Sequence, residues 1–218
     1  MYSSPEKTYR DIIKEQGLEH SSKTNEETQI TILDWMTQQQ ELYPKGSKVI
    51  YDRCPLDNLV YTLQGNLRGL ISDDIAAVTI PIVRESMRNL DIIFWLKYNP
   101  AIKIVDDGLR DSDLEYIKET DQIFSEVFQD HMDNLDNDIF FPKDDCPAII
   151  ALDDMFPTVD DRMMFIGEFL DTNGDLIETA ESVLSPESLE LFERMMTEQE
   201  KQKEADDRLN EIIKSLKA

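Results

Sequence analysis

The chain has 218 residues, of which 22 are Lys or Arg and 46 are Asp or Glu, so its formal net charge is −24. A hydrophobic content of 40% is enough to build a core, and the length suits one domain, or one domain with an appendage. The acidic charge disfavours nucleic-acid phosphates and anionic lipid as partners. Two cysteines and two histidines are too few for a disulfide scaffold or a multi-histidine metal site.

The acidic excess is concentrated in the second half of the chain. Residues 1–100 hold 11 basic and 14 acidic side chains, a net of −3, whereas residues 101–218 hold 11 and 32, a net of −21. Two interpretations stay open, a solvated surface that aids solubility and an acidic arm for a basic partner. The N-terminal segment lacks the apolar core of a signal peptide, and Ile92–Leu96 is too short to span a bilayer. We therefore expect a cytoplasmic protein with no membrane partner.

Helical patterns dominate the first part of the chain. A short helix is predicted over 5–16, opened by Ser4-Pro5 and closed by Gly17, and a longer amphipathic helix over 26–42. Further helices are expected over 56–67, 73–89, 113–132 and 158–170, the last with Thr158 as its N-cap.

Three short apolar runs lie between these helices, at 49–51, 92–96 and 148–152. None of them alternates between apolar and polar residues, which is typical of strands buried on both faces of a parallel sheet. Strands that alternate with helices of this length predict an α/β domain.

The C-terminal part begins with a turn signal. Asp171-Thr172-Asn173-Gly174-Asp175 resembles a calcium loop only superficially, because Gly174 stands fourth where an EF-hand needs glycine sixth, so a tight turn is predicted. Ser185-Pro186 then opens a long acidic helix that runs to about residue 217, through which the chain could self-associate. The expected division is a domain over 1–170 and a turn with a helical extension over 171–218.

The segment most relevant to chemistry follows the first apolar run, where Asp52 and Arg53 precede a predicted helix. Ligands of open α/β sheets bind at the carboxyl ends of strands. An Asp there can hold Mg²⁺ through water or accept a proton, and the adjacent Arg can grip a phosphate. Asp57 and Tyr61 lie four residues apart and share one face of the helix. The alternative is a helix-capping Asp57 and a surface Asp-Arg pair.

A second segment, around Gly108 and Arg110, precedes the helix predicted from residue 113. A flexible glycine next to an arginine suits a lid that brings a cation to a transferring phosphate. The alternative is a capped loop in which Arg110 only offsets the neighbouring acids.

Together these segments resemble the phage-type P-loop nucleotide kinase-like family, related to thymidylate kinases and to AAA-domain NTPases typed on the NadR kinase domain. The matching pieces are VIYDRCPLDNLVY at 49–61 and DDGLRDSDLEYIKETDQIF at 106–124, with the lead-in TYRDIIKEQGLEH and the strand spacing. The resemblance spans roughly residues 8–170 and implies an incomplete P-loop kinase-like three-layer fold with a short parallel sheet. It also implies the host cytoplasm as the location if a phage encodes the chain.

The resemblance also implies roles for individual residues. Asp52 would assist Mg²⁺ or the acceptor hydroxyl, and Arg53 would hold the acceptor phosphate or sugar. Asp57 and Tyr61 would shape the acceptor pocket, and Arg110 would be the lid arginine. The implied cofactors are ATP and Mg²⁺. The implied partner is a nucleotide or nucleoside-like small molecule, with DNA disfavoured by the net charge.

The sequence departs from that family at its defining motif. No glycine here begins GxxxxGK(S/T), so the loop that cradles nucleotide phosphates is absent, and in the family it would lie upstream of Met1. The missing family strand would lie between the runs at 49–51 and 92–96, so these runs must either pair directly or leave a gap. We hypothesise a truncated enzyme, with a degenerate relative or completion by a separate chain as alternatives.

The function expected from the sequence is that of an ATP-dependent phosphotransferase-like protein acting on a nucleotide or nucleoside-like acceptor, inactive as written because the phosphate-binding loop is absent. The alternatives are a non-catalytic acidic binding or scaffold module and an ATPase or GTPase regulator. Nucleotide binding separates the first possibility from the scaffold.

Overall fold

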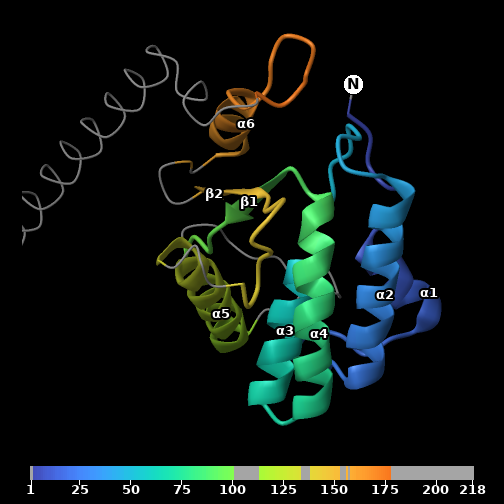
Figure 1. Cartoon of the computed structure of the whole chain (residues 1–218). Coiled ribbons are helices and arrows are strands. Elements are labelled where there is room, and N and C mark those ends of the chain that lie inside the picture. The colour runs from blue at the N-terminus through green and yellow to red at the C-terminus, as the bar shows by residue number, and fades with distance from the viewer. Residues whose placement is uncertain (1, 101–112, 134–137, 153–155, 157, 178–218) are drawn as a thin grey trace, which may run out of the picture. The chain divides into compact units, whose positions relative to one another are not determined.

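A computed structural model of the chain describes residues 2–100, 113–133, 138–152, 156 and 158–177 (Figure 1). The chain forms two compact units, Met1–Asp153 and Asp154–Ala218. The described residues have a mixed α/β fold with six α-helices and one two-stranded parallel sheet, which confirms the coarse fold class. The three-layer kinase-like architecture and the domain boundary at residue 170 stay predictions. Arg110 and the helix predicted over 185–217 lie outside the described residues.

The first two helices have clear capping signals. Helix α1 (Tyr9–Gln16) begins later than predicted because Thr8 caps it: the backbone N–H and the hydroxyl of Thr8 both donate to the Asp11 carboxylate, at 2.8 Å each. Gly17 ends the helix with a φ of 64°, as predicted. Helix α2 (Glu26–Leu42) has the predicted bounds, and the Asn25 side chain accepts a hydrogen bond from the backbone N–H of Thr28 at 2.9 Å.

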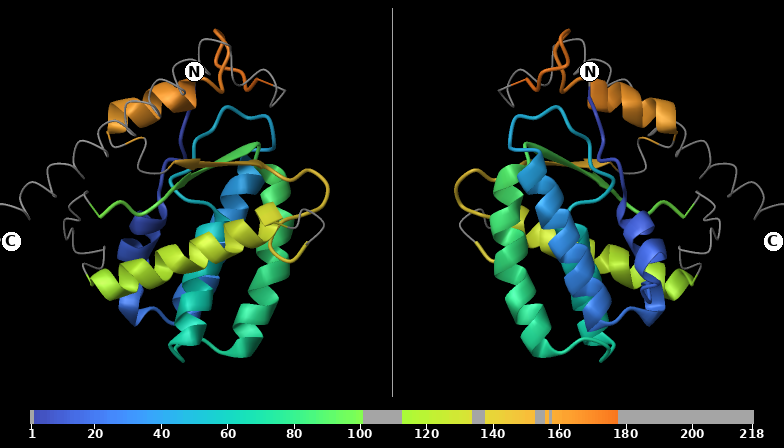
Figure 2. Two further views of the ribbon diagram at one scale, coloured as in Figure 1. Left: turned by 90° about the vertical axis from the view of Figure 1, so that its left-hand side faces the viewer. Right: turned by 90° about the vertical axis from the view of Figure 1, so that its right-hand side faces the viewer.

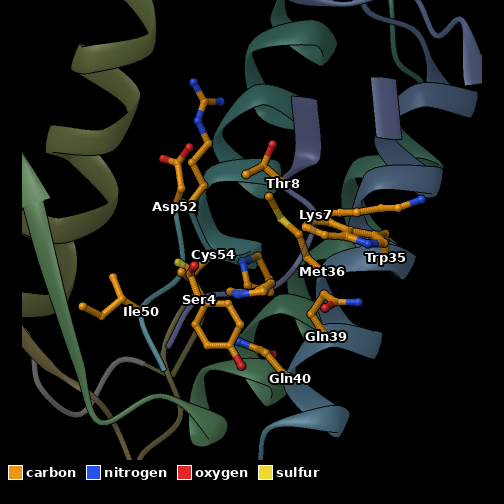
Figure 3. A pocket seen from close by; sticks show the side chains of 14 residues that line it. Ser4, Lys7, Thr8, Trp35, Met36, Gln39, Gln40, Ile50, Asp52 and Cys54 are labelled. Atoms are coloured by element: carbon orange, nitrogen blue, oxygen red, sulfur yellow. The ribbon is translucent and has the colours of Figure 1, made fainter. Parts of the chain in front are cut away.

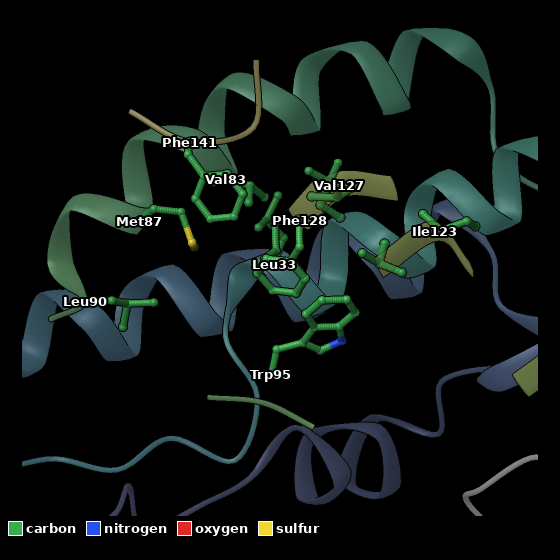
Figure 4. Packing of buried hydrophobic residues seen from close by; sticks show 12 residues of the cluster. Leu33, Val83, Met87, Leu90, Trp95, Ile123, Val127, Phe128 and Phe141 are labelled. Atoms are coloured by element: carbon green, nitrogen blue, oxygen red, sulfur yellow. The ribbon is translucent and has the colours of Figure 1, made fainter. Parts of the chain in front are cut away.

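Helix α3 (Pro55–Leu67) is the centre of the first unit, because it contacts α2, α4 (Asp73–Ser86) and α5 (Leu114–Asp133) (Figures 1 and 2). Short 3₁₀ turns occur at η1 (Ser21–Lys23) and η2 (Met87–Asn89). All of these α-helices were predicted, with ends that differ only slightly. Their buried side chains form one apolar cluster: Leu33, Leu56, Leu59, Val60, Val83, Met87, Leu90, Trp95, Ile123, Val127, Phe128 and Phe141. Figure 4 shows Phe128 in this cluster, where its ring lies 4.6 Å from that of Trp95 and 5.9 Å from that of Phe141.

Two of the three predicted strands form. β1 (Ile92–Leu96) pairs in parallel with β2 (Ala148–Leu152), with Ile93 opposite Ile149. The prediction that the strands are buried on both faces is wrong, since Leu96 is 55% exposed. One face of the sheet, which carries Trp95, packs on the apolar cluster.

The third predicted strand, over 49–51, is wrong. Val49 makes a single bridge to Ser3, and Ile50 is 61% exposed. Two backbone hydrogen bonds join this segment to Ser3: the Ser3 N–H donates to the Lys48 carbonyl, and the Ser3 carbonyl accepts from the N–H of Ile50, at 2.9 Å each. The segment therefore pairs with the start of the chain and does not join the sheet of the described residues, so its direct pairing with 92–96 is not observed.

The described part of the second unit consists of helix α6 (Val159–Gly167) and a turn. The predicted N-cap is confirmed, because the Thr158 hydroxyl accepts a hydrogen bond from the backbone N–H of Asp161 at 3.1 Å. The helix ends before the predicted residue 170. The predicted tight turn is also confirmed: Gly174 has a φ of 74°, and Leu170 bridges antiparallel to Leu176.

Among the described residues of both units, none of the helices has the length and apolar character needed to cross a membrane.

Candidate functional site

A pocket of about 270 Å³ lies in the first unit, between the N-terminal segment, helix α2 and residues 50–55 (Figure 3). Trp35 and Met36 of α2 supply apolar surface on one side, and Asp52 and Arg53 line the other. Gln40 of α2 is the most deeply buried polar residue in the lining, at 2% exposure. The pocket thus combines apolar walls with a few polar groups, as ligand sites commonly do.

The Arg53 side chain is held between two aromatic rings. Its guanidinium carbon lies 4.3 Å from the ring centroid of Tyr9 and 4.9 Å from that of Tyr61. The backbone of Arg53 has a φ of 78°, in the left-handed region that non-glycine residues rarely adopt and that costs on the order of 1–3 kcal/mol. Backbone strain of this kind is concentrated at functional sites, but Ser21 and Asp145 also have a positive φ, so the strain supports a site at Arg53 only together with the two ring contacts.

Arg53 stays protonated, and its guanidinium N–H groups have no hydrogen-bond partner among the described residues. Burial alone would lower the pKa of Arg53, but Tyr61, Asp57, Tyr9 and Asp52 together raise it above its ordinary value. Within the described part of the chain, the guanidinium makes neither a hydrogen bond nor an ion pair. A guanidinium fixed between two rings with its planar donors unused is well suited to bind a phosphate or carboxylate.

Asp57 acts first as a helix cap. Its carboxylate accepts a hydrogen bond from the backbone N–H of Cys54 at 2.9 Å and so stabilises the start of α3. Burial raises the pKa of Asp57, whereas the neighbouring Arg53 lowers it, and the net shift is upward. The capping role considered from the sequence is therefore present, alongside an electrostatic contact with Arg53.

Asp52 is exposed at the rim of the pocket, where it lies on the same side as Ile50 and Cys54 (Figure 3). No cluster of three or more acidic, histidine or cysteine side chains suited to a metal occurs among the described residues. Mg²⁺ in phosphoryl-transfer sites commonly uses one or two carboxylates together with substrate phosphates. Asp52 fits such a partial role as one carboxylate, but the described residues offer no cage made of protein ligands alone.

The structure brings four of the five predicted site residues together. Asp52 and Arg53 line the pocket. Tyr61 stacks on Arg53 and Asp57 lies close enough to raise the pKa of Arg53, but both are outside the pocket lining. The fifth residue, Arg110, lies outside the described residues.

Two residues of the site, Tyr9 and Gln40, were not predicted from the sequence. Tyr9 reaches Arg53 from a distant helix, and no local pattern indicates such a contact. Gln40 could have been found, because it continues the buried row of Ile32 and Met36 at helical spacing, where an apolar residue is expected.

A second pairing of reactive side chains lies away from the pocket. The Cys146 Sγ is 3.6 Å from Nε2 of His131. Burial raises the pKa of the Cys146 thiol and lowers the pKa of His131, so both groups are held neutral. A nucleophilic cysteine needs the thiolate, so this pair is not an activated nucleophile.

The chain was compared with known proteins by sequence and by structure. No protein-family model matches it, and no match was found among curated proteins or solved structures. The site therefore has to be interpreted from its own geometry.

Proposed function

We propose that this chain is an ATP-dependent phosphotransferase-like protein whose pocket binds the phosphorylated acceptor, a nucleotide or nucleoside-like molecule. The single observation that carries the proposal is Arg53, a strained cation stacked between Tyr9 and Tyr61 at the edge of the pocket. The resemblance of residues 49–61 and 106–124 to nucleotide kinases supports the same assignment.

The chemistry of the proposed site is positioning by charge. The Arg53 fork binds the acceptor phosphate, and the two tyrosine rings restrict its plane, so little side-chain entropy is lost when the phosphate arrives. Asp52 stands next to it as the carboxylate that orients the acceptor hydroxyl or a magnesium-bound water. The sequence has no GxxxxGK(S/T) motif, so no residue is assigned to the ATP phosphates, and the residues of this pocket act on the acceptor alone.

The test is the thermal stability of the chain with deoxynucleoside monophosphates and with Mg-ATP. A ligand that binds only the native state adds about 2.7 kcal/mol at 100 times its Kd. For a chain of this size, that corresponds to a rise in Tm of about 5–10 °C. We expect this rise with at least one monophosphate and not with Mg-ATP.

Variants identify the residue responsible. Arg53→Met removes the cation and should abolish the rise in Tm, and Arg53→Lys, which keeps the charge without the planar fork, should retain only part of it. The matched control is Arg68→Lys, because Arg68 also stacks on a tyrosine, Tyr116 at 5.1 Å, but is paired with Glu119 at 2.7 Å outside the pocket. Equal shifts in wild type and Arg53→Met would refute the proposal. The absence of a shift with every ligand, in a chain that unfolds cooperatively, would favour the acidic scaffold.

A further inference from the structure

Gln40 is a buried residue whose side-chain amide makes no hydrogen bond to any described residue. It is 2% exposed, and neither its Oε1 nor its Nε2 has a hydrogen-bond partner among the described residues. The hydroxyl of Tyr51, in the same pocket lining, is also buried and without a hydrogen bond to any described residue. Buried polar groups are nearly always hydrogen-bonded, so three such atoms in one lining call for a physical explanation.

The two other buried glutamines of the described residues are paired, although Asn58 Oδ1 and Thr62 Oγ1, outside the pocket lining, also lack a partner there. Gln64 is equally buried, yet its Nε2 donates to the Tyr116 carbonyl at 3.0 Å and its Oε1 accepts from the Thr120 hydroxyl at 2.8 Å. Gln29 is likewise paired, through Thr24 and Asn58. The chain thus satisfies its structural glutamines internally, whereas the amide that lines the pocket has no partner among the described residues.

An unpaired amide presents one acceptor next to one donor, so its complement is a ligand edge with a donor next to an acceptor. The Watson–Crick edge of a nucleobase has this arrangement. Trp35 and Met36 supply the apolar surface that a planar ring needs, on the same helix as Gln40 (Figure 3). The volume of about 270 Å³ is just below the range of about 300–1,000 Å³ typical for drug-sized ligands, which suits one base with its sugar.

The charged groups determine in which orientation the ligand binds. Lys7 also lines the pocket, but its Nζ is engaged with the Glu15 carboxylate at 2.7 Å. Arg53 has no such partner in the described residues, which leaves it as the cation for a ligand phosphate. We propose that Gln40 turns its buried amide toward the base edge of a nucleoside monophosphate whose base packs on Trp35 and whose phosphate is bound by Arg53. This inference rests on the proposed function and adds to it the recognition of a nucleobase by a named residue.

Calorimetric titration with the four deoxynucleoside monophosphates and with 2-deoxyribose 5-phosphate, which lacks a base, tests this inference. A bidentate contact to a base edge is worth about 1–3 kcal/mol, or about 5- to 150-fold in affinity. We expect the affinities of the four monophosphates to differ by a factor in this range, and packing on Trp35 to make each of them bind more tightly than the sugar phosphate. Gln40→Met should reduce the factor between the monophosphates to near one without weakening the sugar phosphate. Gln38→Met, on the exposed side of the same helix, should leave the factor unchanged.

The outcomes separate the two proposals. If the sugar phosphate and every monophosphate bind equally well to the wild-type chain, base recognition is refuted and phosphate binding by Arg53 stands. A preference for one base that persists in Gln40→Met would refute the role of Gln40. If none of the five ligands binds, both proposals fail.

Discussion

Replacing Gln40 by Met should stabilise the ligand-free chain, which is the reverse of what most substitutions in a protein core do. Gln40 buries two polar atoms that find no hydrogen bond among the described residues. A buried group left unsatisfied costs about 1–3 kcal/mol, and an apolar side chain of the same shape removes this cost without opening a cavity. Taking that range for the whole amide, and about 2–4 °C per kcal/mol at this chain length, Gln40→Met should raise Tm by about 2–12 °C.

The assay is calorimetric or circular-dichroism unfolding of wild type, Gln40→Met and Gln64→Met without ligand. Gln64→Met is the matched control, because Gln64 is buried to the same degree but bonded at both ends of its amide, so its loss removes the hydrogen bonds that it makes to Tyr116 and Thr120. The control should be destabilised by about 1–3 kcal/mol. A Gln40→Met chain that is less stable than wild type would show that the amide has partners in solution and is not held ready for a ligand.

Three further predictions concern residues outside the pocket lining. Gly65→Ala should destabilise the chain by about 1 kcal/mol, because a Cβ there would lie 2.6 Å from Cδ1 of buried Ile71, and this overpacking exceeds the gain in helix propensity. The second substitution Ile71→Val, which removes Cδ1, should relieve the overpacking. A Gly65→Ala chain that is more stable than wild type would contradict this packing. Burial lowers the pKa of His131 below 6.5, so the stability that neutral His131 contributes is present above pH 6.5 and is lost as pH falls through the lowered native pKa. Denaturant unfolding as a function of pH should show this loss in wild type and not in His131→Gln, and parallel profiles would refute it. Asn25→Ala should cost about 1 kcal/mol in the same assay, because it removes the cap on the Thr28 N–H, whereas Asn25→Gly should cost only a few tenths.

The helices of the first unit could be predicted because their signals are local. The 26–42 periodicity with Asn25 before it, and Gly17 after the first helix, each specify a boundary within a few residues of sequence. The strand prediction over 49–51 was wrong because a strand requires a pairing partner. Three apolar residues do not indicate that this partner is Ser3 at the start of the chain. Ile50 is accordingly exposed, although its neighbours in sequence look like a buried strand.

The site was predictable only in part. Asp52 and Arg53 line the pocket, but they were expected there as the carboxyl end of a strand over 49–51, and that strand does not form. The contact of Arg53 with Tyr9 joins segments far apart in sequence. The positive φ of Arg53 has no sequence signal, because arginine, unlike glycine or asparagine, is not enriched in that conformation. Gln40 was visible as a polar residue in an apolar row, but whether such a residue is paired depends on its tertiary neighbours.

The central claim is that this chain binds a nucleoside monophosphate through Arg53. Its most direct test is a calorimetric titration of the purified 218-residue chain and of Arg53→Met with the monophosphate that stabilises the chain most. We expect saturable binding of one ligand per chain to wild type, and its loss in an Arg53→Met chain that is still folded by circular dichroism. Binding of equal strength to both chains, or no binding to wild type, would contradict the claim.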